Sequence, residues 1–78
     1  MLREAFRALE RLVEEREAFF DRNERLNSEG RKLLEAASRI LAREARSLRG
    51  YVRRARRSGS LEDVVRLLEA LRELSGGD

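Results

Sequence analysis

The sequence contains no cysteine, histidine, proline or tryptophan, and its aromatic residues are three phenylalanines and one tyrosine. Without cysteine the chain has no disulfide, no thiol chemistry and no thiolate metal site. Without histidine it lacks the commonest general base and the commonest ligand of transition metals. No apolar run approaches the roughly 18 residues of a membrane-spanning helix, and no secretory signal pattern is visible. We therefore expect a cytoplasmic or recombinant soluble protein that needs no cofactor or metal.

Charged and apolar residues make up most of the 78-residue chain, at 42% and 41%. This charge content raises the question of disorder, but the net charge is only +3 and the apolar residues recur with helical spacing. Leucine, alanine, glutamate and arginine dominate, and all four favour helices. The length leaves no room for a second core, so we expect a single helical domain over residues 1–78.

Two breaks divide the chain into three predicted helices. The breaks are Asn27-Ser28-Glu29-Gly30 and Ser58-Gly59-Ser60, and the helices cover about 2–26, 29–57 and 61–74. Ser28 is the predicted N-cap of the second helix, and Gly59 stands where a helix end favours a left-handed residue. Ser60 with Asp63 indicates a capping interaction at the start of the third helix.

Short loops join consecutive helices antiparallel, so the pattern predicts an all-α, antiparallel three-helix bundle with two long helices and one short one. The short third helix covers only half of the hairpin made by the other two. The apolar residues left open would drive self-association, most simply into a two-fold dimer. They are Phe19, Phe20, Leu26, Leu33, Leu34, Ala37 and Ile40. The alternative is a monomer whose third helix tilts to cover more of the hairpin.

Polar residues interrupt the apolar faces of the two long helices. Arg16 and Asn23 lie on the first face and Glu44 on the second, so we expect a polar layer in the core, with Arg16 paired to Glu44. The other interpretation is a pocket in which Arg16 binds an anionic ligand. Tyr51 also falls on the apolar face of the second helix, and Gly50 would allow a backbone to approach closely.

The charge is concentrated in the middle of the chain. Residues 28–57 carry +7, whereas residues 1–27 carry −1 and residues 58–78 carry −3. Arginines on the polar face of the second helix form a predicted ridge that could neutralise a row of phosphates. They are Arg39, Arg43, Arg46, Arg49, Arg53, Arg54 and Arg57. No aromatic residue is interleaved with them on this face of the helix, so base stacking on the ridge is not indicated. Alternatively, Glu35, paired with Arg39, and the acids of the third helix neutralise the ridge.

The sequence contains no catalytic motif, no glycine-rich phosphate loop and no pattern for a small-molecule substrate or a membrane surface. We therefore predict a non-enzymatic helical bundle that acts by self-association. The alternative function is binding of nucleic acid, or another polyanion, through the arginine ridge.

Two resemblances bear on this choice. With its minimal loops, its Ser60 cap and an alphabet of only fourteen residue types, the whole chain resembles de novo designed helical bundles, which implies a protein without a natural activity. About a third of the chain resembles the start of the translin family, through Asp21-Arg22-Asn23-Glu24-Arg25-Leu26, Arg31, Leu33, Ser38-Arg39 and Arg46. That family implies oligomeric helical bundles that bind single-stranded nucleic acid. Its chains are much longer, and its acidic nuclease positions lie outside the matched part.

Overall fold

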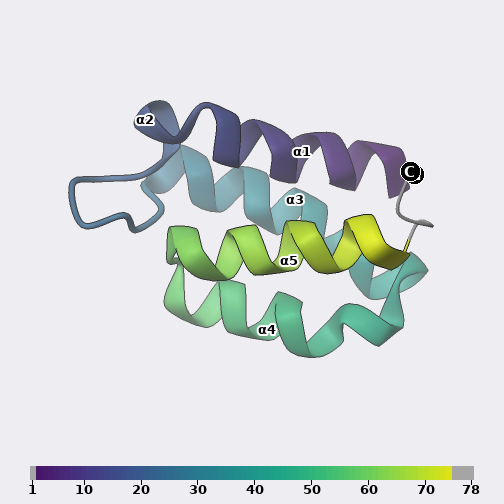
Figure 1. The fold of residues 1–78 in the computed structure, drawn as a ribbon. Coiled ribbons are helices and arrows are strands. Elements are labelled where there is room, and N and C mark those ends of the chain that lie inside the picture. The colour runs from purple at the N-terminus through teal and green to yellow at the C-terminus, as the bar shows by residue number, and fades with distance from the viewer. Residues whose placement is uncertain (1, 75–78) are drawn as a thin grey trace.

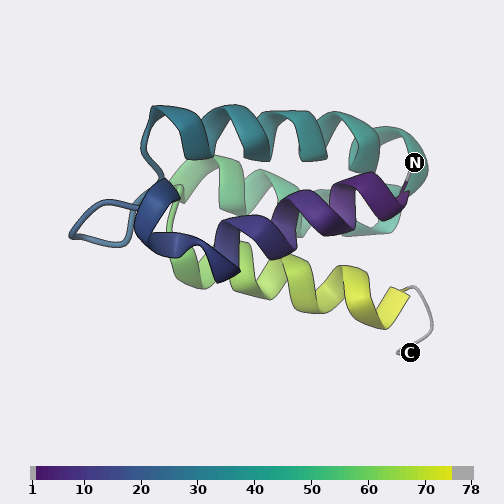
Figure 2. The same ribbon diagram turned by 90° about the horizontal axis from the view of Figure 1, so that it is seen from above.

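The computed structural model describes residues 2–74 and confirms the all-α fold class. The elements are α1 (Leu2–Glu14), the single-turn α2 (Arg16–Phe19), α3 (Ser28–Glu44), the 3₁₀ turn η1 (Arg46–Leu48), α4 (Arg49–Ser58) and α5 (Leu61–Leu74). The longer helices α1, α3, α4 and α5 lie side by side, and each runs antiparallel to the one before it (Figure 1). Figure 2 shows α1 lying across α3 and α5, with α4 completing the bundle. No helix within residues 2–74 has the length and apolar character needed to cross a membrane.

The second predicted helix is interrupted, which makes the predicted three-helix arrangement wrong. Ala45 leaves the helical region at φ −143° and ψ 61°, and η1 reverses the chain before α4 begins. A continuous helix over 29–57 would extend about 44 Å at 1.5 Å per residue, whereas the longest dimension of the molecule is 33 Å. The reversal buries Ala45 and Leu48 in the turn and packs Val52 and Ala55 of α4 inside the bundle. Burial of apolar surface therefore outweighs the helical hydrogen bonds lost at the break.

The first predicted helix also ends earlier than expected, because residues 20–27 form a compact loop. The Asp21 Oδ1 atom accepts hydrogen bonds from the amides of Asn23 and Arg25, at 2.8 and 3.0 Å, and Glu24 adopts a left-handed conformation at φ 62°. The loop is joined to the α4–α5 turn: the Leu26 amide donates to the Gly59 carbonyl at 2.8 Å. These contacts tie two segments that are distant in the sequence to one end of the bundle.

The apolar surface that was expected to be open is largely covered by the chain itself. Phe19, Phe20, Leu26, Leu34 and Ala37 are buried in the main core. Leu33 and Ile40 are half-buried and pack against it. The loop over residues 20–27 and the reversed α4 provide the cover that a second chain was expected to supply. Self-association stays a prediction, but this patch no longer requires it.

The helix ends follow the sequence signals at two of three places. Gly59 ends α4 in the left-handed conformation, at φ 64°, as predicted. The Ser60 hydroxyl accepts a hydrogen bond from the Asp63 amide at 3.2 Å, which confirms the cap of α5. The predicted Ser28 cap is wrong, because Asn27 takes that place: its Oδ1 accepts from the Gly30 amide at 2.8 Å. The Asn27 side chain also donates through Nδ2 to the Ala18 carbonyl at 2.8 Å. The amide group of asparagine can therefore accept one hydrogen bond and donate another at this helix start.

These contacts make Asn27 more important to stability than Ser28. We expect Asn27→Ala to lower the free energy of unfolding by about 1–2 kcal/mol, because it removes the cap and leaves the Ala18 carbonyl without this partner. Ser28→Ala should change it by less than about 0.5 kcal/mol, since Ser28 is exposed. Urea unfolding followed by far-UV circular dichroism measures both values. Equal losses in the two variants would contradict the assignment of the cap to Asn27.

Candidate functional site

The break at Ala45 redistributes the predicted arginine ridge over two antiparallel segments. Arg39 and Arg43 lie on α3, Arg46 lies in η1, and Arg49, Arg53, Arg54 and Arg57 lie on α4. All seven side chains are exposed. We call these seven residues the arginine face. The structure therefore replaces one straight row of charges with two rows that meet at the chain reversal.

Part of the arginine face converges on a groove between α3 and α4. Four of its members, Arg39, Arg46, Arg49 and Arg53, line this groove, which has a volume of about 380 Å³. Arg56, which was not among the predicted site residues, lines it as well. On one continuous helix Arg56 would lie beside the straight ridge and not in it. Only the reversal of α4 turns this residue toward α3. The predicted row thus supplies a two-sided basic groove.

The charges of the arginine face are not neutralised within residues 2–74. Glu35 pairs with Arg56 across the groove, with Nη2 and Oε2 2.8 Å apart, and not with Arg39 as the sequence spacing suggested. On α5, Glu62 pairs with Arg66, and the Asp63 carboxylate accepts a hydrogen bond from the Ser58 hydroxyl. The seven arginines of the face have no ion-pair or hydrogen-bond partner for their side chains in the described part of the chain. Like charges around one groove repel each other. They also make the electrostatic potential in the groove more positive, which attracts anions.

A single hydroxyl lies among these arginines. Ser38 lines the groove on the α3 side and is only 4% exposed. Its Oγ atom has no hydrogen-bond partner among residues 2–74. Because a buried hydroxyl normally has a partner, the groove contains a polar group that the rest of the fold does not use.

The predicted polar layer in the core is wrong. Arg16, Asn23 and Glu44 are all exposed. Arg16 lies in α2 and Asn23 in the loop at one end of the bundle, whereas Glu44 is the last residue of α3 at the other end (Figure 1). The cause is the early end of α1, which removes Asn23 from any helix face and places Arg16 on a surface turn. Neither the ion pair between Arg16 and Glu44 nor a pocket built on it forms.

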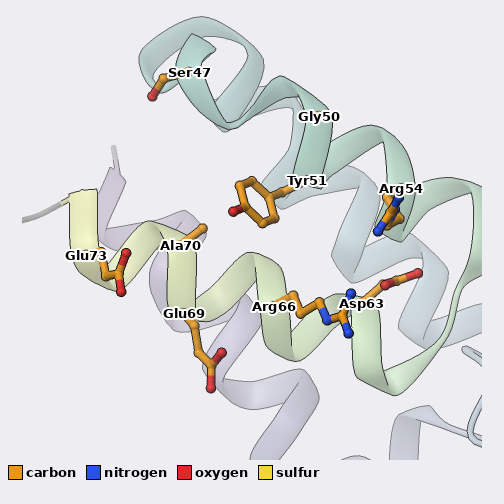
Figure 3. Close-up of a pocket in the computed structure, with 9 residues that line it drawn as sticks. All are labelled: Ser47, Gly50, Tyr51, Arg54, Asp63, Arg66, Glu69, Ala70 and Glu73. Atoms are coloured by element: carbon orange, nitrogen blue, oxygen red, sulfur yellow. The ribbon is translucent and has the colours of Figure 1, made fainter.

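A second groove lies on the other side of α4, between α4 and α5. It has a volume of about 590 Å³, and Tyr51 extends from α4 into it on the side of Ala70 (Figure 3). Tyr51 was expected on the core face of a long helix, but it is 47% exposed. Gly50 was expected at a close backbone contact, yet a Cβ atom there would meet nothing of residues 2–74 within 4 Å. Both corrections follow from the break, since α4 starts a new helix whose buried side is formed by Val52 and Ala55.

Residues 2–74 contain no cluster of carboxylates able to hold a metal ion. Comparison of the chain with known protein families, with curated proteins and with solved structures gave no match. The resemblances to designed bundles and to the translin family therefore stay predictions.

Proposed function

We propose that the protein is a non-enzymatic helical module that binds nucleic acid through the arginine face. The observation that carries this proposal is the groove between α3 and α4, where Arg39, Arg46, Arg49 and Arg53 meet without ion-pair partners among residues 2–74. Arginine presents a planar fork of donors that matches two phosphate oxygens at once. A groove lined by such side chains gains favourable interactions from a phosphate backbone and loses the repulsion between its own charges.

The extent of the arginine face favours a polymer over a single small anion. Arg54 and Arg57 do not line the α3–α4 groove; together with Arg53 they border a separate hollow on α4. Arg43 lies on α3 and lines neither groove. A chain of phosphates can neutralise arginines spread over this distance, whereas one phosphate cannot. Such binding depends on salt and little on base sequence.

The proposal is tested by titrating labelled single- and double-stranded oligonucleotides at about 50 and 200 mM salt. We expect binding at the lower salt and a loss of affinity of about 100-fold at the higher one, the fall predicted when roughly four phosphates are neutralised. Sedimentation of the free protein at several concentrations, measured alongside, reports whether it self-associates. Failure to bind either oligonucleotide at about 50 mM salt would overturn the proposal.

A further inference from the structure

The groove between α4 and α5 combines an open aromatic ring with a space beside it. Tyr51 extends into the groove, and its neighbours there include Gly50, which has no side chain, and Ala70, whose side chain is short (Figure 3). The Tyr51 hydroxyl has no hydrogen-bond partner in the described part of the chain. The side chain is 47% exposed, so the fold uses neither its ring nor its hydroxyl fully.

The two walls of this groove differ in charge. On the α4 wall Arg54 has no partner within residues 2–74 and continues the arginine face. On the α5 wall Glu69 and Glu73 are also unpaired, while Arg66 is engaged by Glu62. Phosphates are therefore attracted to α4 and repelled from the far wall of the groove. A strand whose backbone follows α4 would direct its uncharged bases, and not its phosphates, into the space beside Tyr51.

We propose that Tyr51 stacks against an unpaired base of a nucleic-acid strand whose phosphates are held by the arginine face. The inference rests on the proposed function and adds the class of ligand, a strand with accessible bases. Stacking of a base on an aromatic side chain tolerates every base, because each base has a π-face, and its loss weakens binding by roughly 5- to 100-fold. Tyr51 and Arg54 are neighbours on α4, one helical turn apart. The fold leaves Tyr51 exposed instead of buried in the core, so its ring is available beside this arginine.

The composition of the chain supplies a direct probe. Tyr51 is the only tyrosine and there is no tryptophan, so the intrinsic fluorescence of the intact protein reports on this one ring. Three ligands of equal length are compared at about 50 mM salt: a single strand of thymidines, the same strand without bases, and a blunt duplex. We expect quenching by the thymidine strand, and no quenching by the abasic strand or the duplex.

Variants at position 51 separate stacking from charge. Tyr51→Leu should weaken binding of the thymidine strand by roughly 5- to 100-fold and leave binding of the abasic strand unchanged, whereas Tyr51→Phe should retain the native affinity. Because the residue is exposed, both variants should keep the native far-UV circular dichroism. Equal affinity for the thymidine and abasic strands, with no effect of Tyr51→Leu, would overturn the stacking site and leave the proposed function standing. Absence of binding to any of the three ligands would overturn both.

Discussion

Replacing Gly30 with alanine is expected to lower the free energy of unfolding by about 2–3 kcal/mol, although alanine is the better helix former. Gly30 is buried in the first turn of α3, and an added Cβ atom would lie 2.6 Å from the carbonyl oxygen of Phe19 and 2.7 Å from Cδ2 of Leu26. The Phe19 carbonyl cannot retreat freely, because it accepts the Asn27 amide at 2.9 Å. A domain of this size is rarely stabilised by more than about 3–5 kcal/mol, so the variant should be close to unfolding at room temperature.

Gly50→Ala is the matched control for this prediction. A Cβ atom at position 50 meets nothing within 4 Å among the described residues, and only the gain in helix propensity remains. We expect this variant to be more stable than the native protein by about 0.5–1 kcal/mol. Urea unfolding followed by circular dichroism compares the two directly. Stabilisation by both substitutions would show that the close packing of α3 against Phe19 is absent.

Removing three charges from the α3–α4 groove is expected to have the largest effect on binding. The combined variant Arg46→Gln, Arg49→Gln and Arg53→Gln should bind oligonucleotides about 100-fold more weakly at about 50 mM salt. The slope of the logarithm of affinity against the logarithm of salt concentration should fall by about 2 to 3, since roughly one phosphate contact is lost for each arginine. All three side chains are exposed and have no partner in the part of the chain that the structure describes, so the fold should be retained. Fluorescence anisotropy across several salt concentrations measures both quantities.

A second triple variant controls for net charge alone. Arg7, Arg16 and Arg22 are exposed, have no ion-pair partner within residues 2–74, and lie outside the arginine face. Changing all three to glutamine lowers the net charge by the same three units, yet it should reduce affinity by less than about 5-fold, because only the long-range attraction weakens. Equal losses in the two triple variants would mean that binding follows the overall charge of the protein and not the groove.

Local sequence signals were reliable where they concerned one helix end or one periodic segment. The predicted third helix over 61–74 coincides with α5, and the conformation of Gly59 and the Ser60 cap are as expected. In each case the deciding feature lies within a few residues. Gly59 adopts the left-handed conformation easily because it has no Cβ atom, and the Ser60 hydroxyl accepts from an amide only three residues further along the chain. The all-α class followed from the periodicity of the apolar residues over the whole chain.

The errors occurred where local preference allowed a helix and packing prevented it. Ala45-Arg46-Ser47-Leu48 contains no proline or glycine, so nothing in it signals a reversal. Phe20 to Leu26 also lacks proline and glycine, although Asp21 and Asn23 favour turns. The contact of Leu26 with Gly59 in this loop joins residues far apart in the sequence. From these two errors came the others: the open apolar patch, the polar layer of Arg16, Asn23 and Glu44, and the buried Tyr51.

The sequence by itself determined that this protein is helical, where its positive charge is concentrated, and that it lacks histidine and cysteine chemistry. Those properties depend on composition and on spacing along one helix. Only the tertiary structure decided that Arg39 of α3 shares a groove with Arg46, Arg49 and Arg53 and that Tyr51 is open to solvent. The reason is that α4 folds back to bury Val52 and Ala55 against the rest of the core, a gain in apolar burial that no local pattern records.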